Sequence, residues 1–341
     1  MKARSVGIVL ETKEDAVEAV SNIIKDEKLN IDDMYHWREP EEIDSILRSI
    51  RSFGFEARLI GTPDNLAYNL RFLKNNVDFI FNLSVGFKKR FRLALGPALY
   101  ETAGIPYSGA DPYTKMVSQN KHLMKSLWDK MNIPTPPWVY VDSLSGLEEL
   151  VLPDFPLIVK PAYEGSSIGI NANAVSYDRE GVTQKIKDII ETLRIPVIVE
   201  KFIPGKEYKI GIIGNKNKKF FGMIEDVKRD GSSLKNDFIY FNAKTYGMFY
   251  KVRRDIDKPE FEKLKRDCEA IYHMFLPVDY GTFDIRVDEA GNHYFLEFNA
   301  DATLHPQRTL AQCCKLNGLD YENMIGQILK TSFERWGIAW N

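Results

Sequence analysis

The stretch Phe155-Pro-Leu-Ile-Val-Lys-Pro-Ala-Tyr-Glu-Gly-Ser-Ser-Ile-Gly169 decides the fold of this chain. An apolar run of β-type residues ends at Lys160, a loop of small residues follows at 164–167, and further β-type residues come after it. This pattern is typical of a β-hairpin with a glycine- and serine-bearing tip. Lys160 would place an ammonium at the end of a strand, and the tip's N–H groups and hydroxyls would surround a phosphate. Because such loops usually only turn the chain, the interpretation depends on residues further along.

Size and composition limit the classes of protein that the chain fits. Its 341 residues suffice for two or three domains, and 44% apolar with 28% charged residues is ordinary for a globular protein. A net charge of −2 gives no reason to expect a nucleic-acid or membrane partner, and no apolar run is long enough to cross a bilayer. The apolar run after Lys2 and Arg4 is too short for a signal peptide, so we expect a cytoplasmic protein.

The three cysteines are Cys268, Cys313 and Cys314. An odd and sparse count argues against a disulfide framework, and the adjacent pair lacks the spacing of a metal site. We expect buried, reduced thiols.

The order of predicted elements indicates an α/β fold in three parts. Strands at 5–10, 56–61 and 77–82 alternate with helices at 13–26, 41–53 and 93–103, which predicts a small parallel-sheet domain over residues 1–112. A helix over 113–131 then precedes prolines at 134–137, a plausible hinge. Strands and helices of mixed order follow, and we place a central subdomain at 113–207 and a C-terminal subdomain at 208–341.

Two carboxylates lie on neighbouring predicted strands. Asp284 and Glu297 belong to strands at 281–288 and 293–298 joined by a tight turn, and Asn299 follows on the same face as Glu297. Two carboxylates and an amide oxygen suit Mg²⁺, which also takes nucleotide phosphates as ligands. A solvated strand end is the alternative. The apolar residues flanking the pair argue against it: Phe283, Ile285, Phe295, Leu296 and Phe298.

The stretch 197–207 contains a third pattern. A hydrophobic strand ends in Glu200 and Lys201, two apolar residues follow, and Glu207 comes after a Pro-Gly turn. Such a strand end can offer backbone groups to an adenine edge while Phe202 and Ile203 cover its face, and Glu207 would bind a ribose hydroxyl. The commoner alternative is a strand end with a surface ion pair.

Together these residues resemble the ATP-grasp superfamily, in its D-alanine–D-alanine ligase-like branch. The resemblance covers most of the chain and follows its order. It comprises Asp78–Asn82, Gly104–Gly109, Lys121, Asn132–Pro137, the Lys160 hairpin, Glu200–Glu207, Ala243-Lys244, Asp284 and Glu297–Asn299. It implies an N-terminal α/β domain followed by two antiparallel-sheet subdomains that clasp ATP.

The resemblance also implies a set of site residues. Lys121 and Lys160 would bind phosphates, and Ser166 and Ser167 would lie on a loop that closes over them. The adenine pocket would consist of Glu200, Lys201, Phe202 and Ile203, with Glu207 at the ribose and Lys244 on a second closing loop. Asp284, Glu297 and Asn299 would hold Mg²⁺, or Mn²⁺. Our candidate catalytic residues are Lys244, Ser167, His305 and Arg308.

The implied chemistry joins a small-molecule carboxylate to an amine. ATP phosphorylates the carboxylate, and the amine attacks the acyl phosphate to give an amide, ADP and phosphate. Lysines and Mg²⁺ would neutralise charge on the transferred phosphoryl group, and closing loops would exclude water. A homodimer is also implied by the resemblance.

The chain departs from the family pattern on the substrate side. Thr282 stands where dipeptide ligases of this branch carry an arginine, and a threonine supplies no positive charge. Arg286 lies further along the same strand face, and a surface arginine is an equally good interpretation of it. Residues 300–308 lack the family's glycine; His305 there would act as a base, bind a carboxylate or simply pack, and Arg308 is a candidate replacement charge. The basic segment 84–92 would hold an anion or begin a solvated helix, and Glu11 or Glu14 would orient an amine.

We therefore expect a carboxylate–amine ligase whose substrates are not two D-alanines. The alternatives are an authentic D-alanine–D-alanine ligase and an ATP-binding sensor or scaffold that has lost ligation.

Overall fold

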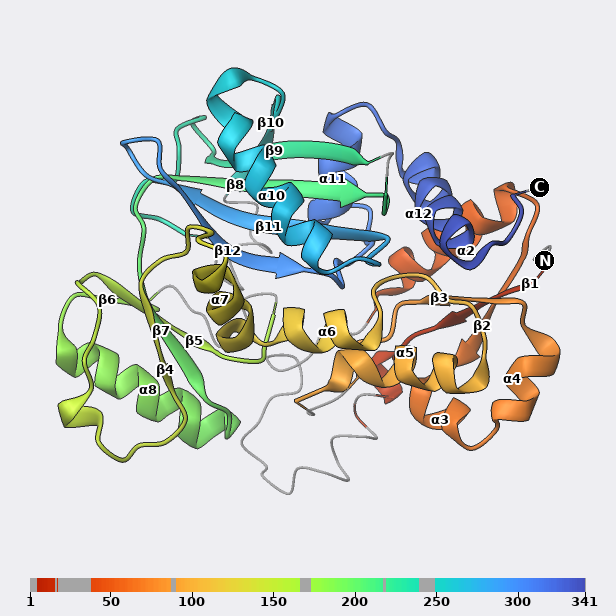
Figure 1. Cartoon of the computed structure of the whole chain (residues 1–341), viewed down its shortest axis with the longest axis horizontal. Helices are drawn as coiled ribbons and strands as arrows, with labels where there is room; N and C mark the ends of the chain where they lie inside the picture. The colour runs from red at the N-terminus through yellow and green to blue at the C-terminus, as the bar shows by residue number, and fades with distance from the viewer. Residues whose placement is uncertain are drawn as a thin grey trace.

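The computed structural model describes residues 5–15, 17, 38–86, 90–165, 173–216, 219–238 and 249–340, arranged around three β-sheets (Figure 1). Several predicted features lie outside the described residues: Ser166, Ser167, Lys244 and most of the helix expected over 13–26. Within the described residues, no helix has the length and apolar character needed to cross a membrane.

The first sheet is parallel, as the alternation of elements predicts. β1 (Ser5–Val9) lies between β2 (Glu56–Gly61) and β3 (Phe79–Asn82). The accompanying helices are α2 (Pro40–Ser52), α3 (Pro63–Ala67), α4 (Leu70–Asn76) and α5 (Arg92–Ala103). α5 ends where Gly104 adopts a φ of +68°, a left-handed conformation that favours glycine.

The single helix predicted over 113–131 is wrong, because Asn120 divides it. α6 spans Pro112–Gln119 and α7 spans Lys121–Lys130. Asn120 has φ −99° and ψ 99°, and its side-chain oxygen accepts hydrogen bonds from the N–H groups of His122 and Leu123 at 3.1 and 3.2 Å. Asparagine competes with the helical backbone in this way and caps a new helix. The break places Lys121 in the first turn of α7.

The second sheet is antiparallel and covered by one helix. Its strands are β4 (Trp138–Val141), β7 (Val197–Lys201), β5 (Leu157–Pro161) and β6 (Val175–Ser176), in that order. Buried residues of α8 (Arg179–Leu193) pack against the apolar residues of β5 and β7. The β5–β6 pair is the hairpin expected around Lys160, and residues 166–172 of its connection lie outside the described residues.

The third sheet has five antiparallel strands. They run in the order β10 (Phe249–Arg254), β9 (Phe220–Lys228), β8 (Lys206–Ile213), β11 (Tyr280–Val287) and β12 (His293–Asn299). α10 (Glu262–Met274) packs against the sheet through its buried apolar residues. α11 (Thr309–Leu316) lies so near the backbone of β8 that a Cβ on Gly211 would be 2.9 Å from that of Cys313.

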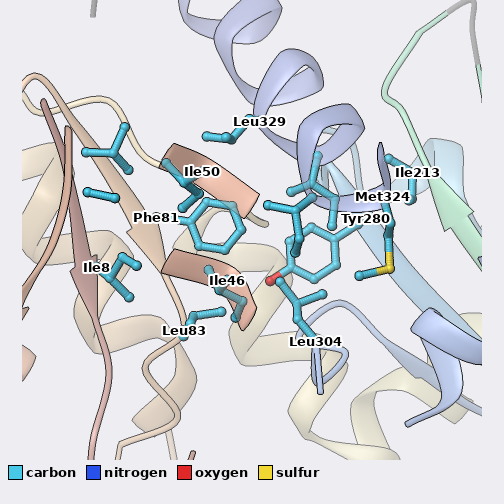
Figure 2. Close-up of a cluster of buried hydrophobic side chains, with 14 of the residues drawn as sticks. Ile8, Ile46, Ile50, Phe81, Leu83, Ile213, Tyr280, Leu304, Met324 and Leu329 are labelled. Carbon is cyan, nitrogen blue, oxygen red and sulfur yellow. The ribbon is translucent and has the colours of Figure 1, made fainter. Parts of the chain in front are cut away.

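The first and third sheets share a core through the last helix. α12 (Tyr321–Trp336) packs against α2, and their side chains belong to one buried cluster. Figure 2 shows Leu329 near Ile50 and Phe81, and Met324 beside Tyr280 and Ile213. All three cysteines are free and buried, which confirms the expectation for them. The boundaries 1–112, 113–207 and 208–341 stay a prediction.

Candidate functional site

Charged side chains converge where α7 meets the second and third sheets. We call them the charged cluster: Lys121, Lys125, Lys160, Glu200, Glu207, Lys209, Asp284, Arg286 and Glu297. Seven of the nine are buried, while Asp284 and Glu297 are half-buried. Charge of this kind persists in a protein interior only when it is paired.

Glu200, at the end of β7, is held between two lysines. Its Oε2 lies 2.9 Å from Nζ of Lys125, and its Oε1 accepts a hydrogen bond from Lys160. Lys125 also donates to Oγ1 of Thr135 at 2.6 Å. Burial opposes ionisation, but the two ammonium groups outweigh it and lower the pKa of Glu200 to about 2. Glu200 therefore stays ionised and fixes Lys160 at the end of β5.

Glu207 has a cation on each carboxylate oxygen. Nζ of Lys209 lies 2.7 Å from Oε1, and Nη1 of Arg286 donates to Oε2 at 3.0 Å. Burial again opposes ionisation, and the two cations lower the pKa of Glu207 to about 2. Each carboxylate oxygen can accept more than one hydrogen bond, so a ribose hydroxyl would share an oxygen with one of these cations.

Arg286 is not a surface residue, and that interpretation is wrong. It is 2% exposed and faces Glu207, its ladder partner on β8. Its guanidinium donates to the carbonyls of Ile203, Lys235 and Asp237 at 2.9 to 3.1 Å. It also lies 5.0 Å from the ring centroid of Phe202. Arg286 thus ties the segment after β7 to the loop after β9.

The segment after β7 offers a backbone donor. The N–H groups of Lys201 and Phe202 bond to the carbonyls of Pro137 and Pro156, each at 2.8 Å. Among the described residues, the N–H of Ile203 takes part in no hydrogen bond. Phe202 and Ile203 are both buried. Of the backbone donors expected to meet an adenine edge, Ile203 is therefore the best placed.

The expected metal ligands are ladder partners. Asp284 on β11 pairs with Glu297 on β12, and Asn299 lies two residues further along the same strand face. Nζ of Lys121 is 3.0 Å from Oε1 of Glu297, and Nζ of Lys209 is 3.3 Å from Oδ2 of Asp284. Lys121 also donates to the backbone carbonyl of Glu164.

The electrostatic environments of the two carboxylates differ. Burial raises the pKa of Asp284, and the neighbouring Glu297 and Glu207 add to the effect against the opposing Lys209. For Glu297 burial acts in the same direction, but Lys121 and Lys160 outweigh it and lower the pKa. Glu297 is therefore the better anion of the pair.

These residues fit Mg²⁺ in composition. Within the described residues, no three His, Cys, Asp or Glu side chains gather into a site that would hold a metal by themselves. Two carboxylates and an amide would leave the remaining ligand positions to phosphate and water oxygens, as Mg²⁺ prefers. A zinc site would need a fuller set of protein ligands.

His305 and Arg308 make contacts away from the charged cluster. Nδ1 of His305 accepts a hydrogen bond from the N–H of Gln307 at 3.1 Å, and its Nε2 lies 3.5 Å from Glu39. Arg308 precedes α11 and lies 3.7 Å from the same Glu39. His305 is buried, which matches the packed alternative, whereas the Arg308 side chain is 42% exposed.

A second buried network surrounds Asp301, just after Asn299. Lys115 hydrogen-bonds Asp301, and Arg38 lies 3.8 Å from it and 3.2 Å from Glu42. Glu11 accepts hydrogen bonds from the N–H groups of Val85 and Gly86 at 2.7 and 3.1 Å. Burial raises the pKa of Glu11 to about 6. Charged side chains thus lie at Glu11 and at residues 300–308, where the sequence departs from the pattern of the family that it resembles.

Comparison with protein families identifies the chain. Residues 127–330, more than half of it, match the family model described as D-ala D-ala ligase C-terminus. The chain belongs to this family. Within that span lie Lys160, Glu200, Glu207 and both ladder-paired carboxylates.

Individual relatives of this family are distant in sequence. The Uncharacterized protein y4sG of Sinorhizobium fredii (strain NBRC 101917 / NGR234) is 25% identical over 317 residues, which cover 88% of this chain and 90% of that protein. A D-alanine–D-alanine ligase of Marinomonas sp. (strain MWYL1) is 25% identical over 243 residues, covering 70% of this chain and 73% of that protein.

Solved structures match over nearly the whole chain. The D-alanine–D-alanine ligase from Bacillus anthracis complexed with ATP has a TM-score of 0.70 at 19% identity and covers 98% of each chain. The VanG D-Ala:D-Ser ligase from Enterococcus faecalis has a TM-score of 0.69 at 17% identity, covering 97% of this chain and 100% of that one. At such identities the likeness concerns the fold, and the predicted ATP-grasp fold is confirmed.

Sequence reasoning missed several charged residues of this family member. Lys125 lies four residues after Lys121, on the same face of α7, and Lys209 lies two residues after Glu207, on the same face of β8. These spacings place the two lysines on the same faces as Lys121 and Glu207, but they do not reveal which residues the lysines contact. Lys115, Arg38 and Asp301 are brought together only by the tertiary fold.

Proposed function

We propose that this protein is an ATP-dependent carboxylate–amine ligase that forms an amide through an acyl phosphate. The observation that supports this most directly is the charged cluster. It gathers lysines from α7, β5 and β8 beside the ladder-paired Asp284 and Glu297. A triphosphate with its metal ion needs this combination of cations and carboxylates in one place.

The residues of the charged cluster and of the closing loops would each contact a different part of the nucleotide or its metal ion. Lys121 and Lys160 would bind phosphates, and Ile203 and Glu207 would contact the adenine and ribose. Asp284, Glu297 and Asn299 would hold Mg²⁺, which would neutralise charge on the transferred phosphoryl group. Lys244, Ser166 and Ser167 remain proposed residues of the closing loops.

The reaction proceeds in two displacements. A substrate carboxylate oxygen attacks the γ-phosphorus of ATP, and ADP leaves. The amine nitrogen then attacks the acyl carbon, phosphate leaves and the amine gives up a proton. Because the acyl phosphate hydrolyses readily, the residues must exclude water while it exists. The proposal includes small-molecule substrates, a cytoplasmic location and a possible homodimer.

The substrates we propose are not two D-alanines. Thr282 and the segment 300–308 depart from the family pattern, and Asp301 of that segment pairs with the buried Lys115 of α6. D-alanine–D-alanine ligation is the second candidate, because curated relatives such as that of Marinomonas sp. have that name. A sensor that has lost ligation is the third, and the retained cations and carboxylates argue against it.

A phosphate-release screen tests the proposal. Purified protein with ATP and Mg²⁺ is incubated with pairs drawn from libraries of carboxylic acids and amines, with D-alanine included, and products are identified by mass spectrometry. We expect release that depends on one carboxylate and one amine, and release at least about 100-fold slower from the matched Glu297→Gln variant. Rapid dipeptide formation from D-alanine alone would establish the second candidate. Nucleotide binding without release for any pair would establish the third.

A further inference from the structure

Lys209 places a buried cation beside an expected metal ligand. It is 9% exposed, and its Nζ lies 2.7 Å from Oε1 of Glu207 and 3.3 Å from Oδ2 of Asp284. Lys209 and Asp284 are ladder partners on the neighbouring strands β8 and β11, so the pairing of the two strands places them opposite each other. The ammonium is therefore positioned by the sheet itself.

Alternating charges extend across the same sheet. Arg286 pairs with Glu207, Glu207 with Lys209, and Lys209 with Asp284. Because Glu207 also binds the ammonium of Lys209, this positive charge stays near Asp284 even when the Lys209–Asp284 contact lengthens. Lys121 differs, because it reaches Glu297 from α7 and has the carbonyl of Glu164 as a second partner.

The candidate ligands have room for more than one cation. Asp284 lies opposite Glu297, and Asn299 lies two residues further along the same face of β12. A carboxylate among several oxygen ligands can be shared by two divalent ions, as in two-metal sites. An ammonium and a divalent ion against the same carboxylate would repel each other strongly at such short range. The position at Asp284 is therefore already taken by a charge of the protein.

We propose that Lys209 replaces one divalent cation at Asp284, so that the nucleotide site binds a single metal ion at Glu297 and Asn299. This narrows the three metal ligands of the proposed function to two, and Asp284 pairs with Lys209 instead. This inference rests on the proposed function, because it assumes that a nucleotide and its metal bind at the charged cluster. Lys209 is a positioning residue in this arrangement: its ammonium balances the charge of Asp284, and the nucleotide brings one ion instead of two.

Counting bound Mn²⁺ tests the inference without turnover. The free Mn²⁺ signal in electron paramagnetic resonance is titrated with the protein in saturating adenylyl imidodiphosphate, a non-hydrolysable ATP analogue. We expect about one ion per chain in the wild type and about two in Lys209→Thr, which frees Asp284. Lys251→Met is the matched control: it removes a lysine of the same sheet that pairs with Asp226, and it leaves the count at one.

A second variant guards against misfolding. Lys209→Met retains the length of the side chain without its charge, and thermal melting verifies its fold. Two ions in the wild type, or a single ion in both Lys209 variants, would overturn the inference and leave the proposed function standing. No analogue binding by the wild type would overturn the proposed function and this inference with it.

Discussion

Glu200 shows how much a single buried carboxylate matters here. It is 1% exposed and neutralises two buried lysines that come from different elements. Removing one partner of a buried ion pair leaves a charge with no compensation in a poorly polarisable interior. At this scale, stability and the candidate site depend on the same atoms.

We expect Glu200→Gln to lower the free energy of unfolding by about 3 kcal/mol. The folded-state pKa of Glu200, about 2, lies below the ordinary value of 4.5, so its contribution is present above pH 4.5 and is lost as the pH falls towards 2. Denaturant unfolding at pH 7 measures the loss. Glu148→Gln, at an exposed position, is the control. Equal stability of the two variants would contradict the expectation.

Glu11 behaves in the opposite way. Burial raises its pKa from 4.5 to about 6, so the stability that its protonated form contributes is present below pH 4.5 and is lost as the pH rises through 6. A shift of this size corresponds to roughly 2 kcal/mol. Between pH 4.5 and pH 8, we expect the free energy of unfolding of Glu11→Gln to rise by about that amount relative to that of the wild type. Parallel pH–stability curves for the two proteins would exclude the shift.

Glu297 is the residue whose loss should affect turnover most. We expect Glu297→Gln to lower phosphate release about 100-fold or more, since it removes the central anion of the expected metal site. Asp284→Asn should cost less, because Lys209 already neutralises that carboxylate. Phosphate release measures both, and thermal melts show whether each variant folds. A larger loss in Asp284→Asn would reverse this order of importance.

At the scale of elements, the break between α6 and α7 determines where the helix that carries Lys121 and Lys125 begins. The N-cap Asn120 fixes the start of α7, which carries Lys121 and Lys125 into the charged cluster. We expect Asn120→Ala to cost about 1 kcal/mol in stability and to weaken nucleotide binding as well. Asp320→Ala removes the matching cap of α12, and it should cost similar stability while leaving the nucleotide dissociation constant unchanged. An equal effect of both variants on binding would contradict this.

The sequence predicts an element well when the interactions that form it join residues close together along the chain. The strands of Asp284 and Glu297 follow from a two-residue alternation and a short turn, so both their existence and their pairing were predictable. The break at Asn120 was not, because apolar spacing continues on both sides of it.

Arg286 and Lys209 illustrate the limit at the candidate site. Whether a charged residue on a strand faces water or another side chain depends on its register with a distant strand. Lys209 on β8 faces Asp284 on β11, and Arg286 on β11 faces Glu207 on β8. In both pairs the two residues are about 75 residues or more apart along the chain. Local patterns predict that a strand forms, but they do not predict what lies opposite each residue.

At the scale of the whole molecule, the contact between α2 and α12 joins the first sheet to the third. A Cβ on Gly326 of α12 would lie 2.5 Å from the ring of Phe53, which follows α2. We expect Gly326→Val to lower stability by about 1 to 3 kcal/mol through this overlap. In a double-mutant cycle, Phe53→Ala should relieve part of the loss, and strictly additive effects would argue against the contact.

The shared core also bears on how the protein is made. Val6 and Ile8 of β1 belong to the same apolar cluster as Met324, Leu329 and Phe333 of α12, and Figure 1 shows the two ends of the chain on one side of the molecule. A ribosome delivers the first strand more than 300 residues before its final partner. The nascent first sheet must therefore wait with an uncovered apolar face, and that interval is when it would most need a chaperone.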